Sequence, residues 1–394
     1  MSETNFSDTE RGSSDRLNLP VLKVIGLGGG GQNAVDRMIE LGLEGIEFIA
    51  ANSDAQVLQN SLAPVKIQLG PKITRGLGAG GDPAIGEEAA EESHAELVKA
   101  LSGADMVFLT CGMGGGTGTG AIPVAANIAR DQGSVVVAIV STPFSFEIGR
   151  RQVNARQGLA KLQQFTDTLI TVPNDRLLQI APHDLSLEMA FRLADDILRQ
   201  GIQGISEIIT QPGLINVDFS HVKKMMKNGG GSLLAIGTGQ GENRVSDALE
   251  HALHHPMLDT INLENATGII ANFTGGENLA FAEVVNALND LHSRTGGRAD
   301  IIPGVISDPR MEDRVQLILV LTGLGGTSLE QARRDVSGLV KEHSVESEET
   351  KSTNFPFLMA DPVAGDEEDS PDPESDIDVP AFMRRKLTKE EHDG

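Results

Sequence analysis

Two glycine-rich segments of the chain each lie where a strand gives way to a helix, and both are suited to holding an anion. The first follows an apolar stretch and reads GLGGGG over residues 26–31. The second, GGGTGTG over residues 114–120, places five glycines and two threonines in seven positions. Glycine lets backbone N–H groups close on a phosphate without interference from a Cβ atom, and the start of the following helix adds a partial positive charge. Because each glycine costs up to about 1 kcal/mol in backbone entropy relative to alanine, the second segment favours binding over a structural turn.

The negative charge of such a phosphate would be met without a basic side chain, since neither glycine segment contains lysine or arginine. The chain also lacks the G-x-x-x-x-G-K-[ST] motif, which excludes a P-loop with its phosphate-binding lysine. Backbone amides, helix dipoles, hydroxyl groups and a bound cation would replace it, and this favours a triphosphate held with Mg²⁺. The first segment alone also fits the G-x-G-x-x-G pattern of nicotinamide-dependent oxidoreductases, which stays open as an alternative.

The elements around these segments predict an α/β fold. Short apolar strands alternate with helices across residues 21–183, typical of a mostly parallel, Rossmann-like sheet covered by helices on both faces. There we expect strands at 21–25, 48–51, 106–110 and 135–141, and helices at 87–101 and 122–131. A long amphipathic helix, with Asp184 and Ser186 as candidate caps, should span 184–209 and lead into a smaller α/β domain at 210–325. In that domain we expect strands at 233–238, 268–274 and 316–321, and helices at 245–254 and 279–295.

The two ends of the chain differ in composition from its middle. Residues 1–20 are polar, and residues 326–375 are acidic, with Pro, Ser and few apolar side chains. Such segments bury too little apolar surface to offset the entropy of ordering them, so we expect both to be disordered. Residues 376–394 contain the apolar and basic stretch VPAFMRRK, which suits a peptide that docks onto another protein and, from composition alone, suits a frayed tail equally well.

Composition and charge exclude several functions. The chain has 32 Lys and Arg against 56 Asp and Glu, a net charge of −24, and neither Trp nor Tyr. We therefore expect no binding of nucleic acid, which would need a basic surface or aromatic stacking platforms. The single cysteine, Cys111, suits a reducing compartment. A polar start and the lack of an apolar run of about 20 residues predict a cytoplasmic protein without direct membrane insertion.

Seven segments, which include the two glycine segments, resemble one known family when they are taken in order. The signature segments of the FtsZ/tubulin family of GTPases are similar to stretches within residues 20–325: VIGLGGGGQNAV, ANSDAQ, RGLGAGG, GMGGGTGTGA, VSTPFSFEIGRR, VPNDRLL and GLINVDF. The acidic linker and the VPAFMRR stretch resemble that family's tail. The resemblance implies a tubulin-like fold, in which a GTP-binding domain is joined by a long central helix to a second domain. It also implies binding of GTP and GDP, with Mg²⁺.

The resemblance assigns many residues to the sugar and phosphates of the nucleotide. It places the phosphates against Gly28, Gly29, Gly30, Gly31, Gln32, Asn33, Gly78, Ala79, Gly80, Gly115, Gly116, Thr117, Gly118 and Thr119. Asn33 is also expected to lie on the base side of the pocket. Residues 78–80 are expected to close over the γ-phosphate. Glu147 is expected on the ribose hydroxyls and Arg151 toward phosphate, although this pair, four positions apart, also suits an exposed ion pair on a helix. Asn52 and Asp54 would lie near the cation, and no metal ligand is assigned.

Asn174, Phe191 and Asp195 are expected, from the resemblance, to bind the base. Guanine presents adjacent N1–H and N2–H₂ donors that a carboxylate accepts in bidentate fashion, and its O6 accepts from an amide NH₂. Adenine has no such donor pair and would leave Asp195 unpaired in a buried site. Phe191, one turn earlier on the same helix, would cover the base. From the residues alone, Asp195 would be a solvated helix residue and Phe191 a core residue.

The loop at 213–221 carries the candidates for hydrolysis, Asn216, Asp218 and His221. By resemblance, this loop reaches the γ-phosphate of the next subunit in a head-to-tail filament, so hydrolysis would be completed in trans. His221 stands where the family pattern expects a second aspartate. A histidine can orient water or accept a proton near neutral pH, but it does not hold a magnesium-bound water as a carboxylate does. We expect assembly with slow hydrolysis; alternatively, Asp218 carries the chemistry and His221 is a tolerated substitution.

The resemblance also implies a cellular role. Filaments of the chain would form the cytokinetic ring at mid-cell and recruit other division proteins. The chain itself would be the main partner, and membrane-tethering adaptors and regulatory division proteins would bind the peptide at 376–394. The alternative is a weakly hydrolysing GTP-binding paralogue with a structural or regulatory role.

Overall fold

The computed structural model describes residues 20–147, 149–179, 181, 185–211, 217–227, 229–258 and 262–324. The predicted linker at 326–375 and the predicted peptide at 376–394 lie outside the described residues. The same holds for residues 1–19 of the predicted N-terminal extension, for the candidate cap Asp184 and for Asn216 of the predicted catalytic set.

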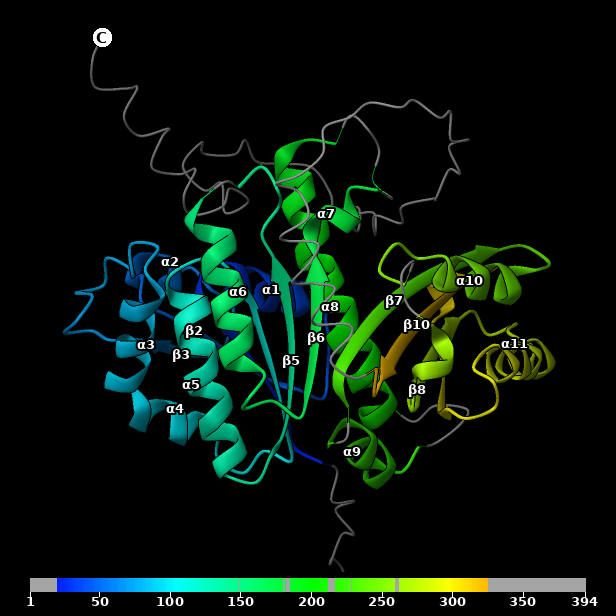
Figure 1. Cartoon of the computed structure of the whole chain (residues 1–394). Coiled ribbons are helices and arrows are strands. Elements are labelled where there is room, and N and C mark those ends of the chain that lie inside the picture. The colour runs from blue at the N-terminus through cyan, green and yellow to red at the C-terminus, as the bar shows by residue number, and fades with distance from the viewer. Residues whose placement is uncertain are drawn as a thin grey trace, which may run out of the picture.

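Ten strands form one sheet in the order β3-β2-β1-β4-β5-β6-β7-β10-β8-β9 (Figure 1). They are β1 (Leu22–Leu27), β2 (Glu47–Asn52), β3 (Val65–Gln68), β4 (Met106–Gly112), β5 (Val135–Thr142), β6 (Thr168–Pro173), β7 (Gly230–Gln240), β8 (Gly268–Gly275), β9 (Asp300–Ser307) and β10 (Arg314–Thr322). The strands from β3 to β6 pair in parallel, so their carboxyl ends share one edge of the sheet. The sheet becomes mixed beyond β7, because β10 runs antiparallel to both β7 and β8. The predicted α/β fold with a mostly parallel sheet is confirmed.

Helices cover both faces of the parallel strands. The helices of the described residues are α1 (Gly28–Glu40), α2 (Ala55–Gln59), α3 (Pro83–Glu92), α4 (His94–Leu101), α5 (Thr117–Asp131), α6 (Arg150–Leu162), α7 (Asn174–Leu177), α8 (Leu187–Thr210), α9 (Phe219–Lys227), α10 (Arg244–Leu253) and α11 (Phe281–Arg294), with short 3₁₀ helices at Leu263–Asn265 and Pro309–Met311; α10 and α11 lie in the second half of the molecule. Side chains of a strand point alternately to its two faces. Accordingly Phe108 of β4 packs in the cluster with α1 and α8, and Leu109 packs with α3 to α6. No described helix is both long and apolar enough to cross a membrane.

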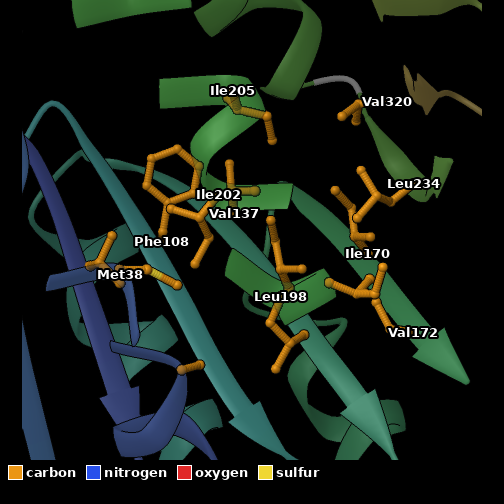
Figure 2. Packing of buried hydrophobic residues seen from close by; sticks show 14 of the residues in the cluster. Met38, Phe108, Val137, Ile170, Val172, Leu198, Ile202, Ile205, Leu234 and Val320 are labelled. Carbon is orange, nitrogen blue, oxygen red and sulfur yellow. The ribbon is translucent and has the colours of Figure 1, made fainter. Parts of the chain in front are cut away.

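Helix α8 connects the two halves of the molecule through its buried face. Leu198, Ile202 and Ile205 pack against Ile170 of β6 on one side and against strands of the second half on the other (Figure 2). Burying each such side chain stabilises the folded chain by roughly 1.5–3 kcal/mol relative to leaving it exposed. A further cluster, between β7, β8, β10 and the helices α10 and α11, forms the separate core of the second half. The predicted long central helix is confirmed, and Ser186 caps it by accepting the N–H of Met189.

Three sequence-based boundaries are wrong, each for a local reason. The helix predicted at 87–101 is broken at Ser93, whose hydroxyl donates to the carbonyl of Gln68 and accepts the N–H of Gly70. The helix predicted to start at residue 122 starts at Thr117, so the second glycine segment itself forms its first turn. Glu147 is not on a helix with Arg151, because α6 begins only at Arg150.

Candidate functional site

The two glycine segments meet at the carboxyl edge of the parallel strands. Strand β1 leads directly into α1 at Gly28, whose φ of +68° favours glycine. A Cβ atom at Gly28 would lie only 2.8 Å from the backbone nitrogen of Gly118, so the segments could not pack this closely with side chains there. The Cβ positions of Gly29 and Gly115, in contrast, have no described atom within 4 Å. The loops therefore touch on one side and leave open space on the other.

Two further glycines of the predicted set close the same contact. A Cβ atom at Gly30 would lie 3.2 Å from the backbone nitrogen of Gly112, and one at Gly31 would lie 2.4 Å from the carbonyl oxygen of Thr110. Both neighbours belong to β4, the strand that precedes the second glycine segment. The first turn of α1 is thus seated on the end of β4.

Helices α1 and α5 begin at these loops with backbone donors that no described side chain accepts. Neither helix has a side-chain cap or an acidic residue in its first turn among the described residues. Helices α2, α3 and α8 differ, because Asp54, Asp82 and Ser186 accept backbone N–H groups there. Free N–H groups and the positive end of the helix dipole attract anions. The starts of α1 and α5 therefore suit a phosphate.

The loop before α3 lies against the second glycine segment. A Cβ atom at Gly116 would lie 2.8 Å from the backbone nitrogen of Asp82 and 2.9 Å from the Cβ atom of Ala79. Gly78 and Gly80 have φ angles of +82° and +60°, which favour glycine. The structure thus places Ala79 and Asp82 of this loop beside Gly116.

Two predicted polar side chains support the loops from within the protein. Gln32 is 3% exposed; its amide donates to the carbonyl of Val57 at 2.9 Å, and its oxygen accepts from Asn52 at 3.4 Å. The Thr119 hydroxyl accepts the N–H of Gly114 at 2.8 Å. Both side chains are engaged with protein atoms, so they shape the loops and leave contact with a ligand to the backbone. Asn33 is half-buried on α1.

Thr117 provides a hydroxyl at the start of α5, in contact with the hydroxyl of Ser53 at the end of β2. The described residues hold no group of three or more His, Cys, Asp or Glu that could bind a metal ion. Mg²⁺ in nucleotide sites keeps several waters and is bound largely by phosphate oxygens, so it needs few protein ligands. The oxygen pair of Ser53 and Thr117 fits that mode of binding.

Glu147 and Arg151 form the expected ion pair beside the glycine segments. The Glu147 carboxylate also accepts the N–H of Phe144 at 2.9 Å, and its side chain is 9% exposed against 42% for Arg151. A Cβ atom at Gly114 would lie 2.8 Å from the carbonyl oxygen of Arg151. The pair thus lies in a fixed position beside the second glycine segment, with the arginine on the solvent side.

Asn174, Phe191 and Asp195 lie at the same edge, on α7 and the first half of α8. Asn174 is 4% exposed, and its Oδ1 atom has no hydrogen-bond partner among the described residues. Burial, with a smaller effect of neighbouring Asp196, raises the pKa of the Asp195 carboxyl to about 8. Unpartnered buried polar groups cost free energy, so this orphaned acceptor is consistent with a ligand that brings a hydrogen-bond donor.

A small aromatic cluster adjoins these polar groups. Phe191 packs edge-on against Phe144 with ring centroids 5.4 Å apart, and Phe144 stacks on Phe146 at 5.0 Å. Phe191 is half-buried and Phe146 is 49% exposed. Phe191 is the member of the cluster predicted to cover one face of a base, and the buried ring of Phe144 holds it from the side.

Asp218 and His221 lie at the opposite edge of the sheet from the glycine segments. Helix α8 has 24 residues, about 36 Å, and Thr210 at its end lies against Gly45, ahead of β2. Helix α9 follows, and its Met226 accepts a hydrogen bond from Thr168 at the start of β6. In Figure 1, α7 lies at the upper end of the sheet and α9 at the lower end.

Both of these side chains are exposed. The N–H of Ser220 donates to the Asp218 carboxylate at 2.8 Å, which lowers the pKa of Asp218 below its ordinary value. Asp218 is therefore ionised and faces solvent, without a phosphate site of its own chain beside it.

Comparison with known proteins decides the family. The model of the tubulin/FtsZ family GTPase domain matches residues 21–182, and the model of the FtsZ family C-terminal domain matches residues 230–325. The chain belongs to the tubulin/FtsZ family of GTPases. An FtsZ dimer from M. jannaschii is 44% identical, with a TM-score of 0.75 over 78% of this chain and 89% of that one. CetZ1 from Haloferax volcanii, a GDP-bound monomer, is 21% identical, with a TM-score of 0.68 over 82% of this chain and 100% of that one. At that identity, CetZ1 supports the fold alone.

Three residues that contact the predicted site were not singled out from the sequence. Phe144, Ser53 and Asn154 each contact a predicted site residue or segment. Phe144 and Ser53 lie inside the segments VSTPFSFEIGRR and ANSDAQ. The resemblance of those segments indicated that they lie near the site, but it assigned no role to these two residues. Asn154 lies just beyond any such segment. The nucleotide roles of the predicted site residues remain predictions, now with a common location.

Proposed function

We propose that this FtsZ-family GTPase polymerises head to tail with GTP and hydrolyses it at the junction between subunits. One observation carries the proposal: the phosphate-binding loops and the acidic residue suited to activate water lie at opposite edges of the sheet. A single chain cannot bring Asp218 to a phosphate held between α1 and α5. A second copy stacked in the same orientation presents its amino edge to the first copy's carboxyl edge. The solved FtsZ dimer and a CetZ2 protofilament with bound GTPγS are precedents among similar folds.

In this proposal the glycine segments hold the phosphates through backbone N–H groups. Loop 78–80 covers the γ-phosphate, Glu147 binds the ribose and Arg151 faces phosphate. Mg²⁺ bound with the triphosphate would neutralise charge on it, and the hydroxyls of Ser53 and Thr117 would offer oxygen donors. Asp218 of the next subunit would orient the attacking water and accept its proton.

Guanine specificity rests on Asn174 and Asp195. The ionised carboxylate accepts the N1–H and N2–H₂ donors, and the NH₂ group of Asn174 would donate to O6. The other atom of that amide, the acceptor Oδ1, has no hydrogen-bond partner among the described residues. Phe191 covers the base, with Phe144 holding its ring from the side.

Complementation between two inactive variants tests hydrolysis in trans. Asp218→Ala leaves the nucleotide pocket intact, whereas Asp195→Ala weakens the pocket and leaves Asp218 intact. Each variant alone should release little phosphate, and their mixture should regain turnover, because one type of junction in the mixed filament is complete. Sedimentation with GTP, with GDP and without nucleotide establishes assembly separately. A mixture that assembles and still releases no phosphate would contradict hydrolysis in trans.

His221 favours a second candidate function, a filament protein that binds GTP and hydrolyses it slowly. The imidazole stands one helical turn after Asp218, at the start of α9, where it is exposed to the neighbouring subunit. Turnover per assembled subunit separates the two candidates: assembly with GTP but with little phosphate release favours the structural or regulatory paralogue.

The cellular part of the proposal is a cytoplasmic ring at mid-cell, tethered through residues 376–394 to membrane-bound adaptors. Family membership and the apolar-basic character of that peptide support it. Fluorescent fusions with and without residues 376–394 test it in cells. The shortened chain should still form filaments with GTP in vitro and should lose its place at the division site.

A further inference from the structure

Asn154 of α6 bridges two loops of the pocket that are far apart in the sequence. Its side-chain amide donates to the carbonyl oxygen of Gly81 at 3.1 Å and to that of Gly114 at 3.3 Å. Gly81 belongs to the loop before α3, and Gly114 opens the second glycine segment. One side chain therefore ties the loop at 78–82 to the segment that starts α5.

The helix face around Asn154 is packed on the same segments. Arg151, one turn earlier, backs onto Gly114, and a Cβ atom at Gly158, one turn later, would lie 2.4 Å from Cγ2 of Thr119. Lys161 forms an ion pair with Glu87 of α3. Positions 151, 154, 158 and 161 share one helix face, because side chains three and four apart are neighbours. Helix α6 is thus a fixed support from which Asn154 reaches the loops.

The loop that Asn154 holds has contacts at its two ends, where the N–H of Gly78 donates to the carbonyl of Ser53 at 3.3 Å and that of Asp82 to the carbonyl of Ala79 at 3.0 Å, and its middle is open. Gly80 and Gly81 are exposed, have φ angles of +60° and +82°, and have no described atom within 4 Å of their Cβ positions. Glycine residues lose the most backbone freedom on ordering, so a glycine loop stays closed only where specific contacts hold it. The bond to Gly81 is such a contact, and it comes from outside the loop.

We propose that Asn154 is a positioning residue that keeps loop 78–82 closed against Gly116 and thereby lets the pocket distinguish a nucleoside triphosphate from a diphosphate. This inference rests on the proposed function, in which the loop covers the γ-phosphate. A triphosphate then meets a loop that is already ordered, whereas a diphosphate does not reach it. Loss of the two hydrogen bonds shifts the ordering cost onto triphosphate binding alone.

The test uses the full-length chain and four proteins: wild type, Asn154→Ala, Asn154→Leu and Asn127→Ala. Leucine keeps much of the volume of asparagine without its donors. Asn127 is the matched control, because it lies on α5 and its side chain pairs with the exposed residues Arg130 and Asp131. Equilibrium binding of GTPγS and of GDP is measured for each, together with hydrogen exchange of residues 78–82 without nucleotide.

Both Asn154 variants should bind GTPγS about tenfold more weakly, which is about 1.4 kcal/mol, and GDP within about twofold of wild type. Their amides at 78–82 should exchange faster, and Asn127→Ala should match wild type in both measurements. Equal weakening of GTPγS and GDP, or no weakening of either, overturns the positioning role and leaves the proposed function standing. A wild type that binds neither nucleotide overturns the proposed function itself.

Discussion

The two edges of the parallel sheet differ in how complete they are. At the carboxyl edge, two glycine segments, two uncapped helices and the base-binding candidates come together from one chain. At the amino edge, Asp218 lies just before α9 and His221 lies on it; both side chains are exposed, and none of the described glycine segments lies beside them. The difference supports the proposal that a single subunit holds the nucleotide, whereas hydrolysis would need contact between the two edges of different subunits. Changes at each edge should therefore affect different measurements.

Loss of the Asp218 carboxylate should have the largest effect. We expect Asp218→Ala to lower phosphate release about a hundredfold or more, since a positioned acid or base contributes roughly 10²–10⁴ to a rate. GTP affinity should stay within about twofold of wild type, because Asp218 lies at the other edge from the pocket. Phosphate release at saturating GTP and equilibrium binding below the assembly concentration provide the two readouts.

Lys224→Ala serves as the control for that variant, because it removes another exposed side chain from the same helix. It should leave turnover per assembled subunit nearly unchanged. If Asp218→Ala weakened GTP binding as much as it slowed hydrolysis, the separation of the two edges would be wrong.

Asp195→Asn should have the next largest effect, on binding. Asparagine keeps the shape of the side chain but cannot accept two donors with a negative charge. Hydrogen bonds to charged groups contribute about 1.5–3 kcal/mol, so GTP affinity should fall roughly 10- to 100-fold. Turnover at saturating GTP should change much less. An unchanged GTP affinity would remove Asp195 from the base site.

Proton release on GTP binding tests the same residue without mutation. The pKa of Asp195 is about 8 in the free chain, against an ordinary 3.8, so the carboxyl is mostly protonated at pH 7. Guanine requires the ionised form, so binding at pH 7 should release up to one proton, and affinity should rise as the pH rises toward 8. Calorimetry in buffers of different ionisation enthalpy measures that proton, which Asp195→Asn should not release.

The effect of Asp195 on the stability of the free chain should run opposite to its effect on GTP affinity: stability should fall as the pH rises. Between about pH 4 and pH 8 the folded chain keeps a proton on Asp195 that the unfolded chain has lost. This group's contribution to the free energy of unfolding is therefore fully present below pH 4 and is lost as the pH rises through 8. Urea unfolding of wild type and Asp195→Asn across that range isolates the contribution.

Much of the carboxyl edge could be predicted from sequence, because its signals are local. Glycine clusters directly after apolar strands mark backbone geometry that few other residues can adopt, and the structure places them together. The start of α8 followed from Ser186 and an apolar stripe. The break at Ser93 could not be predicted, since its hydroxyl bonds residues 68 and 70, which become neighbours only in the fold.

Contacts between distant segments were likewise beyond the sequence. Gln32 reads as a ligand-facing residue, yet its buried amide bonds Val57 and Asn52, a pairing set by how α1 packs on β2. The place of Asp218 at the amino edge follows from the direction of α8 through the sheet. Residue spacing alone does not give that direction.

A smaller effect is expected from His221→Asp at the amino edge. If the imidazole limits the rate, a second carboxylate one turn after Asp218 should raise turnover several-fold, because it can hold a magnesium-bound water. Sedimentation with GTP should be unchanged. Phosphate release no faster than wild type would mean that this position does not limit the reaction.

The smallest effect on GTP affinity is expected from removing the cap of α8. This change compares a helix start that is capped by its own side chain with the uncapped starts of α1 and α5. Ser186 accepts the N–H of Met189 at 3.2 Å and caps α8, and replacing such a cap by alanine costs about 1 kcal/mol of unfolding free energy. Ser186→Ala should show that loss in urea unfolding, while GTP affinity changes less than about threefold, because Asp195 lies more than two turns further along α8. Nucleotide should then stabilise wild type and Ser186→Ala equally, since ligand stabilisation depends on affinity and concentration alone. A much larger loss of affinity would mean that the cap at Ser186 helps to position the base site, and the contrast between capped and uncapped helices would be weaker than the structure indicates.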